Sequence, residues 1–323
     1  NLNILIVGSG YMANEHAKCL KSLGVNISGV ISSKGSKSVD NFMSSYDIEQ
    51  KFTNLEELII NKNTWDAAII CCSEEFTFSY VEKLAKTQKP LLVEKPVTSK
   101  LEEFEDLILY KNIKVGFNRR FYDTISFLKS RLDKERIDLV KVNIPESSIS
   151  EGTSKNKYLP ELVYSNSIHI FDILFYLFGD ISWNSYVKSN KENTLRSCSL
   201  LGLNKDEINF SLDLPFDYPE NFSITIYSNE TRYVLKPIEM LKIYEGIDIQ
   251  EPSDKFPHRI YKPRLQKSIV VESNKKFKTG LFEQDKSFIE FCRSQKYDSR
   301  LASVMDARSS LKAISKIDDL IRK

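Results

Sequence analysis

The tripeptide Glu94-Lys95-Pro96 is the part of this sequence best suited to chemistry. It closes an apolar run, Pro90–Val93, that is typical of a short buried strand. A lysine at the carboxyl end of a strand in an open α/β sheet points into the crevice where such sheets bind ligands. The proline after it disfavours helical geometry at Lys95. The Lys95 ammonium could therefore hydrogen-bond a reacting oxygen and stabilise the negative charge that develops on it.

A second candidate lies near the start of the chain, where a glycine turn follows an apolar strand and precedes a helix. Gly8, Gly10 and Ala13 match the dinucleotide fingerprint, with alanine in the third small position. The first glycine permits the tight turn, the second lets backbone amides approach a pyrophosphate, and the alanine lets helix and strand pack closely. The pyrophosphate would sit at the helix N-terminus, beside Tyr11 and Met12. The turn predicts a dinucleotide cofactor, and together with Lys95 it is interpreted as the site of a nicotinamide cofactor.

The end of the second strand favours one form of that cofactor. In NAD-specific sheets an acidic residue at this place binds the ribose 2′-hydroxyl, but here Ser32 takes it, followed by Ser33 and Lys34. With no carboxylate to repel it, a 2′-phosphate could bond the hydroxyls and pair with Lys34, which favours NADP(H) over NAD(H). The alternative is that Lys34 and Lys37 are surface lysines and that discrimination is loose. Four more residues are expected to contact the cofactor: Cys72, Ser73, Glu94 and Lys95.

These residues need elements that bring strand ends together. The first ~120 residues alternate strand and helix patterns, the signature of a parallel sheet covered on both faces. We therefore predict an N-terminal α/β domain with a Rossmann parallel sheet at residues 1–119. Strands are expected at 2–7, 26–31, 67–72, 90–95 and 114–117, and helices at 13–24, 38–45, 55–60, 80–85 and 101–110.

The pattern changes after this point. A helix at 123–132 leads to a strand at 139–144 and a longer helix at 161–178. Period-two alternation then predicts an antiparallel sheet with one face packed on helices. We predict a C-terminal α+β domain at 120–323 with a large, mainly antiparallel sheet. The alternating segments are 182–188, 194–201, 208–214, 222–227, 233–235 and 269–272, and the closing helices are 281–293 and 302–321.

Composition narrows the classes of partner. A formal charge of +2 in 323 residues favours neither nucleic acid nor an anionic membrane surface, and no stretch approaches the roughly 18 apolar residues of a membrane span. The first residues run straight into a strand, which leaves no room for a signal peptide, and the five cysteines show neither metal-ligand nor disulfide spacing. We therefore expect a cytoplasmic protein without a metal site. His16 is interpreted as structural, and Lys275–Lys278 as a solvated loop.

Four motifs together resemble the glucose–fructose oxidoreductase and inositol dehydrogenase family (Gfo/Idh/MocA), and the likeness runs in order through nearly the whole chain. They are the turn Gly8–Ala13, the tripeptide Glu94-Lys95-Pro96, the segment Gly116–Phe121, and His169–Asp172 before Tyr176–Gly179. The resemblance implies a Rossmann domain followed by a domain whose large antiparallel sheet often serves oligomerisation, here as a homodimer or homotetramer. It also implies hydride transfer to or from sugars, cyclitols and related polyols.

By position, the resemblance matches Lys95 to the family's substrate lysine and His169 to its acid/base histidine. Imidazole can give or take a proton near neutral pH, and Asp172 lies three residues on in a predicted helix, close enough to orient it. Family members often carry an aspartate four residues before that histidine, where this chain has Ser165, so a neighbouring polar group could contribute instead. The residues expected at the substrate are Asn118, Arg120, Tyr122 and Ser165.

These roles have structural alternatives. His169 could be a buried core histidine with Asp172 as its structural partner, and the arginine pair at 119–120 could form an interdomain ion pair. We interpret the chain as an NAD(P)-dependent oxidoreductase acting on CH–OH groups of a sugar-like polyol or its keto form. Two hypotheses compete with this one. One is a catalytically silent nucleotide sensor, and the other is a lyase or glycosidase that oxidises its substrate transiently at a tightly bound cofactor.

Overall fold

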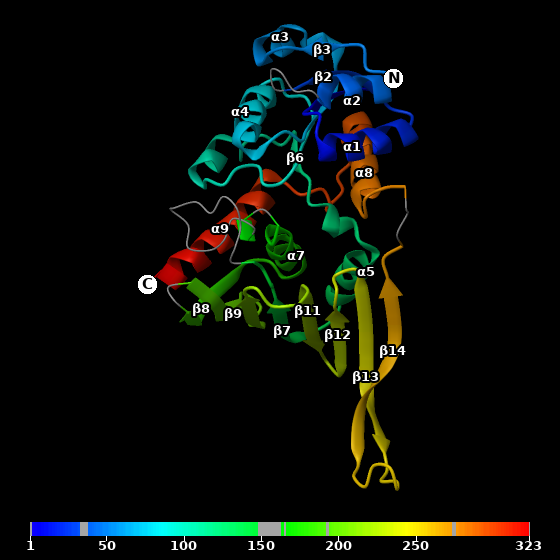
Figure 1. The fold of residues 1–323 in the computed structure, drawn as a ribbon, viewed down its shortest axis with the longest axis vertical. Coiled ribbons are helices and arrows are strands. Elements are labelled where there is room, and N and C mark those ends of the chain that lie inside the picture. Colours follow the sequence, from blue (N-terminus) through cyan, green and yellow to red (C-terminus); the bar gives the residue numbers. More distant parts are fainter. Residues whose placement is uncertain are drawn as a thin grey trace. The chain divides into compact units, whose positions relative to one another are not determined.

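The computed structural model describes residues 2–32, 38–147, 163–164, 166–191, 194–272 and 276–322. The chain divides into two compact units. The first holds residues 1–121 and 273–312, and the second holds 122–272 and 313–323. The sequence-based division places 273–312 with the C-terminal domain, whereas the structure groups this stretch with the first unit. The reason is that helix α8 (Leu281–Ser294) packs on helix α1 (Tyr11–Ser22), as Figure 1 shows.

The first unit is built on a six-stranded parallel sheet in the order β3-β2-β1-β4-β5-β6, which confirms the predicted Rossmann sheet. Every residue of β4 and β5 is buried, as expected of apolar strands covered on both faces. The strand order reverses between β1 and β4, and ligands of open α/β sheets bind at the carboxyl ends beside such a point. The strands are β1 (Asn3–Val7), β2 (Asn26–Ile31), β3 (Lys51–Phe52), β4 (Ala67–Ile70), β5 (Leu91–Val93) and β6 (Ile113–Val115).

Helices cover both faces of this sheet, with α4 on one side and α1 with α8 on the other (Figure 1). The predicted α-helix at 101–110 is wrong, because this segment contains only the 3-10 helix η2 (Glu102–Asp106). Four of its five residues are acidic and only Phe104 is buried, so it offers little apolar surface to hold a longer helix. The other helical elements are α2 (Ser38–Tyr46), α3 (Leu55–Ile60), η1 (Lys62–Thr64), α4 (Glu74–Ala85), η3 (Asn118–Phe121) and α9 (Val304–Arg322), which continues into the second unit.

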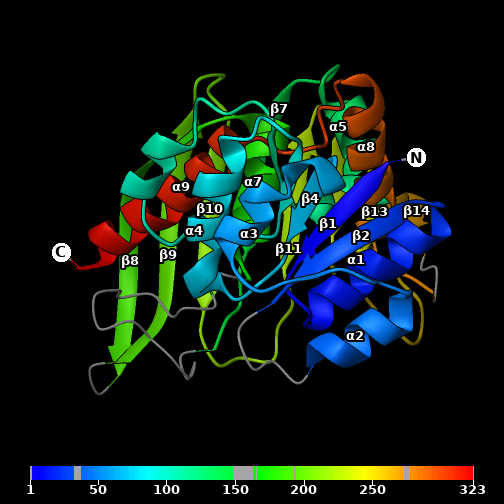
Figure 2. The ribbon, with the colours of Figure 1, turned by 90° about the horizontal axis from the view of Figure 1, so that it is seen from above.

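The second unit is built on an eight-stranded sheet in the order β14-β13-β12-β11-β7-β10-β9-β8. Its neighbours pair antiparallel except for β7 and β10, so the predicted, mainly antiparallel sheet is confirmed. Figure 2 shows β8, β9, β10 and β11 in sequence across the view. The strands are β7 (Ile137–Asn143), β8 (Ile181–Lys191), β9 (Thr194–Asn204), β10 (Asn209–Pro215), β11 (Ser223–Ser228), β12 (Thr231–Leu235), β13 (Met240–Gln250) and β14 (Ile260–Val270).

Two helices of the second unit, α5 (Asp123–Leu132) and α7 (Ile168–Phe178), pack against each other. Nine of the eleven residues of α7 are buried, and Phe178 meets Phe210 of β10 with their ring centroids 5.5 Å apart. The helix ends at Gly179, which has a positive φ of 73°. The predicted start of this helix at 161 lies outside the described residues.

The outer ends of β13 and β14 form a two-stranded ribbon that projects beyond the other strands of the sheet (Figure 1). The sequence pattern predicts only 269–272 of this hairpin. Most of the residues beyond Tyr244 in β13 are exposed, and so are most of β14, which removes the contrast between buried and exposed positions on which the pattern depends. None of the described helices is long and apolar enough to cross a membrane.

Candidate functional site

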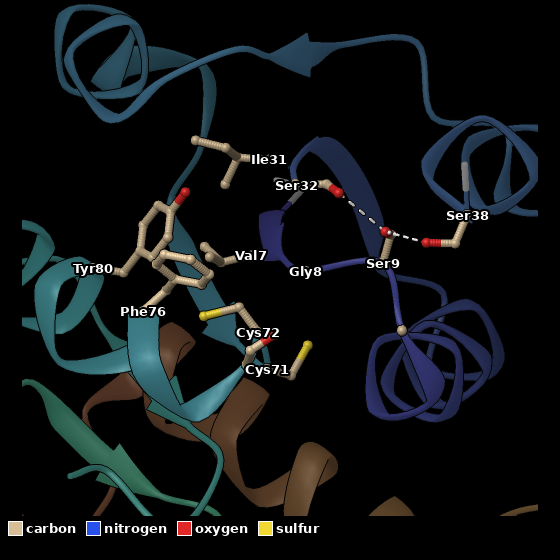
Figure 3. A pocket seen from close by; sticks show the side chains of 12 residues that line it. Val7, Gly8, Ser9, Ile31, Ser32, Ser38, Cys71, Cys72, Phe76 and Tyr80 are labelled. Atoms are coloured by element: carbon tan, nitrogen blue, oxygen red, sulfur yellow. Dashed lines mark hydrogen bonds between the residues drawn. The ribbon is translucent and has the colours of Figure 1, made fainter. Parts of the chain in front are cut away.

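A cavity of about 420 Å³ opens at the carboxyl ends of β1, β2 and β4, beside the reversal in strand order (Figure 3). The predicted cofactor residues Gly8, Gly10, Ser32, Cys72 and Ser73 all line it. The sequence analysis missed the other lining residues, which are Val7, Ser9, Ile31, Ser38, Cys71, Phe76 and Tyr80. Phe76 and Tyr80 lie one turn apart on α4. This spacing of two aromatic residues after β4 is the sequence feature from which they could have been predicted to line the cavity.

The glycine turn is shaped by two different demands. Gly8 has a φ of +115°, and a Cβ there would lie 2.8 Å from the carbonyl oxygen of Cys71, so the fold itself requires glycine. Gly10 begins α1, and a Cβ there would meet no atom within 4 Å, so packing imposes no such requirement. The first turn of α1, which is fully described, carries no acidic side chain. Its backbone N–H groups therefore suit an anion such as a pyrophosphate.

Three serine hydroxyls meet at the end of β2. Ser9 Oγ lies 3.2 Å from Ser32 Oγ and 2.8 Å from Ser38 Oγ (Figure 3). Among the described residues that line the cavity there is no carboxylate. Ser33 and Lys34, which were also predicted to contact the cofactor, lie outside the described residues. The described part of this corner is thus neutral and rich in hydroxyl donors.

Tyr11 and Met12, predicted to contact the cofactor, do not line this cavity. They lie at the start of α1 beneath Lys278, whose ammonium is 5.7 Å from the Tyr11 ring centroid and 3.4 Å from Met12 Sδ. Sequence analysis placed Lys278 in a solvated loop. A hydrogen bond of 2.8 Å from Asn118 Nδ2 to the Thr279 carbonyl ties that loop to η3.

Lys95 follows β5 and is half-buried, and its peptide bond to Pro96 is cis. Burial lowers the pKa of Lys95, since an ammonium loses hydration inside the protein. Glu94 opposes this lowering, whereas Lys278 and Arg119 add to it. Because β5 pairs directly with β4, Lys95 follows the strand next to the one that leads into Cys72 and Ser73.

His16, interpreted from the sequence as structural, joins three elements of the first unit. Its Nδ1 lies 2.9 Å from Asp285 Oδ2 on α8, and its Nε2 lies 3.2 Å from Glu94 Oε1. Burial alone would lower the pKa of His16, but Asp285 and Glu94 outweigh it and raise the value to about 10. A neutral imidazole can donate through one nitrogen only, so two ionised carboxylates, one at each nitrogen, favour the imidazolium form. Nothing in the sequence links Asp285 to a residue 269 positions earlier.

The predicted acid/base pair belongs to the second unit. His169 and Asp172 are both buried near the start of α7, three residues apart. Glu146 brings a carboxylate to the same end of α7, where Ser167 Oγ donates to its Oε1 and Asn166 Nδ2 lies 3.5 Å from that oxygen. Sequence analysis did not single out Glu146, since it lies beyond the end of a strand and outside any motif.

The four predicted substrate residues have different surroundings. Asn118 is bonded to the loop at Thr279, and Arg120, only 1% exposed, lies with its Nη2 3.6 Å from Asp306 Oδ1. Both of these contacts lie within the first unit. The ion pair of Arg120 with Asp306 is therefore not an interdomain ion pair. Tyr122 is buried at the start of α5, and Ser165 lies outside the described residues. Substrate contact by these residues stays a prediction.

The geometry defines a class, because a glycine turn, a reversed strand order and a cavity at the strand ends make a dinucleotide-binding Rossmann unit. Residues 2–114 match the Gfo/Idh/MocA family model, described as "Oxidoreductase family, NAD-binding Rossmann fold". The match covers about a third of the chain, and it agrees with the resemblance seen in the sequence.

Known proteins extend the comparison. The myo-inositol 2-dehydrogenase of Thermotoga maritima is 25% identical over 197 residues, a match that spans 55% of this chain and 55% of that enzyme. The structure of UDP-N-acetylglucosamine 3-dehydrogenase from Acidithiobacillus ferrooxidans superposes with a TM-score of 0.73 at 14% identity, covering 99% of this chain and 97% of that one. An Agrobacterium radiobacter oxidoreductase in complex with NAD+, L-tartaric acid and magnesium gives 0.74 at 14% identity, covering 97% and 94%. At these identities the structural matches show a shared fold.

The raised pKa of His16 predicts a loss of stability in alkali. The folded-state value of about 10 exceeds the ordinary value of 6.5, so this stabilisation is full below pH 6.5 and is lost as the pH rises towards 10. Within that range the free energy of unfolding should fall by about 1.4 kcal/mol per pH unit through this group. Urea unfolding across the range measures it, and His16→Gln should reduce the slope by that amount. A His16→Gln slope equal to that of the unaltered protein, or to that of a His258→Gln control, would contradict the assignment.

Proposed function

We propose that this protein is an NAD(P)-dependent oxidoreductase that transfers a hydride between nicotinamide and a sugar-like polyol or keto-sugar. The observation that carries the proposal is the placement of Lys95 after β5, next to the strand whose end lines the dinucleotide cavity. A bound nicotinamide supplies or accepts the hydride. The inositol and sugar-nucleotide dehydrogenases that the chain resembles support the substrate class, and myo-inositol is the first compound to test.

In this proposal the chain provides a proton donor and a charge for the reacting oxygen. Lys95 donates a hydrogen bond to that oxygen and stabilises the alkoxide that develops as a carbonyl is reduced. Its partial burial strengthens the interaction, because less water competes for the ammonium. His169 exchanges the proton, with Asp172 on the same turn orienting it. Glu146, held by Ser167 at the start of α7, supplies the carboxylate that Ser165 does not.

The two units then divide the work. The first unit binds the dinucleotide and carries Lys95, and the second contributes His169, Asp172 and the surface for self-association. We place the protein in the cytoplasm, which agrees with five cysteines that are all free thiols.

Lys95→Ala should lower kcat roughly 100- to 1,000-fold, the usual cost of removing one donor to a developing oxyanion. The dissociation constant of the cofactor should change little, because Lys95 does not line the dinucleotide cavity. Turnover is followed by nicotinamide absorbance and cofactor binding by fluorescence titration.

Lys114→Ala is a matched control, since Lys114 of β6 is also half-buried in the first unit and burial also lowers its pKa. Near-normal turnover in Lys95→Ala would overturn the mechanism. Product formation without any net change in nicotinamide absorbance would favour the lyase or glycosidase hypothesis instead.

We further propose a preference for NADP(H). Ser32 follows β2, where NAD-specific sheets carry an acid, and its hydroxyl and those of Ser9 and Ser38 beside it can donate to a 2′-phosphate. Ser32→Asp should reverse the preference, lowering the affinity for NADPH by roughly tenfold or more through charge repulsion. The ratio of Michaelis constants for NADPH and NADH reports it, with Ser44→Asp on the exposed side of α2 as the control. A clear preference of the unaltered protein for NADH would refute this part.

Self-association through the C-terminal sheet completes the proposal, as a homodimer or homotetramer. Ile249 and Tyr261 face each other across β13 and β14 and are 54% and 61% exposed, beside the pair Ile247 and Pro263. An isolated two-stranded ribbon is only marginally stable, and a partner covering this apolar face would stabilise it. Light scattering should give a multiple of the 37.3 kDa chain mass, and Ile249→Lys with Tyr261→Lys should reduce it. A monomeric unaltered protein would disprove it, and Ser253→Lys in the ribbon turn serves as the control.

A further inference from the structure

We propose that His16, Glu94 and Asp285 form a buried charge relay that fixes the position and the charge of Lys95. His16 and Glu94 are then positioning residues, which act on the substrate only through that lysine. The inference rests on the proposed function, in which Lys95 is the group that contacts the reacting oxygen.

The relay runs from α8 through α1 to the end of β5. His16 is completely buried on α1, and its two ring nitrogens face carboxylates from two other elements. Asp285 is also completely buried, and the Glu94 side chain is only 13% exposed. The thiols of Cys19 and Cys71 are the other titratable groups at this place. The order of charges is therefore carboxylate, imidazolium, carboxylate, followed by the Lys95 ammonium.

Glu94 has little freedom to move. Its backbone N–H donates to the Ile70 carbonyl at 2.8 Å, and the Gly116 N–H donates to the neighbouring Val93 carbonyl at 2.8 Å. A Cβ on Gly116 would lie 2.8 Å from Glu94 Oε1, so the carboxylate occupies the space that a side chain at 116 would need. Because both its backbone and its carboxylate are held in place, Glu94 fixes the direction of the backbone that leads to Lys95.

The charge of Lys95 depends on the charged groups around it. Lys278 and Arg119 disfavour the ammonium form of Lys95, as burial does, whereas Glu94 and the more weakly acting Glu74 favour it. Glu94 can support Lys95 only while it is ionised, and a carboxylate largely removed from water needs a counter-charge. The imidazolium of His16 supplies that counter-charge, and Asp285 keeps His16 protonated. Removing His16, Glu94 or Asp285 is therefore expected to lower the pKa of Lys95.

The experiment uses Glu94→Gln, which keeps the shape and the hydrogen-bonding capacity of the side chain and removes its charge. Because an opposite charge nearby is worth one or more pKa units, the alkaline limb of kcat/KM should move to lower pH by about one unit. Glu94 was expected from the sequence to contact the cofactor, but it does not line the dinucleotide cavity, so cofactor affinity should stay within about twofold of the unaltered protein. His16→Gln should move the limb in the same direction, since two buried carboxylates without a cation between them bind a proton.

The pKa of Lys95 can also be read without turnover, from the NMR signal of its labelled ε-carbon, which is assigned by its absence in Lys95→Ala. Glu94→Gln should lower that pKa by about one unit. Asp298→Asn is the matched control, because this partly buried carboxylate of the same unit pairs with Arg300 at 2.8 Å and with Ser287 at 2.6 Å. It should leave the Lys95 titration unchanged.

Two outcomes separate the inference from the function on which it rests. A Lys95 titration and an alkaline limb that stay in place in Glu94→Gln would overturn the relay, whatever the loss of rate. Normal turnover in Lys95→Ala would instead overturn the proposed function. If His16→Gln does not fold, the isosteric Glu94→Gln decides the question by itself.

Discussion

One imidazolium between two buried carboxylates joins the elements on which the first unit's site depends. Through His16 it links α1, which begins at the glycine turn, to the end of β5, which leads into Lys95, and to α8 from the other end of the chain. Burying charges costs free energy that only good geometry and complete hydrogen bonding offset. Removing one of these three side chains leaves the charges of the other two uncompensated. Packings of α1, α8 and the end of β5 that would separate the three are therefore strongly disfavoured.

The two parts of the candidate site use different electrostatics. The cavity at the ends of β1, β2 and β4 is lined by hydroxyls, thiols, aromatic rings and backbone, and the N-terminus of α1 beside it has N–H groups suited to an anion. Lys95, by contrast, lies among charged groups of both signs. In the proposed function this division is useful, because the dinucleotide brings its own negative charge, whereas the reacting oxygen acquires charge only as the reaction proceeds.

Much of this could be predicted from local sequence. Gly8, Gly10, Ser32, Cys72 and Ser73 could be placed at one cavity because strand periodicity and glycine turns are local properties, and the alternation of strands and helices likewise predicted the parallel sheet. The rest depends on contacts between distant segments. No pattern near His16 announces Asp285, and Ser38 enters the cavity only because α2 begins beside the turn at Ser9. The sequence also predicted an α-helix at 101–110, where the structure has only the 3-10 helix η2. It missed the ribbon of β13 and β14, because exposed residues there give no contrast between buried and exposed positions.

The return of α8 to the first unit has a consequence for biosynthesis. The ribosome releases His16 and Glu94 well before Asp285, which emerges only after residues 122–272 of the second unit have been made. Until then the nascent Rossmann sheet has its histidine and one carboxylate but not the helix that encloses them. Many N-terminal domains complete their folding during synthesis, but this one must wait for its own distant residues. Cutting the chain between the two units would therefore not release an autonomous nucleotide-binding domain, although the sheet itself is continuous in sequence.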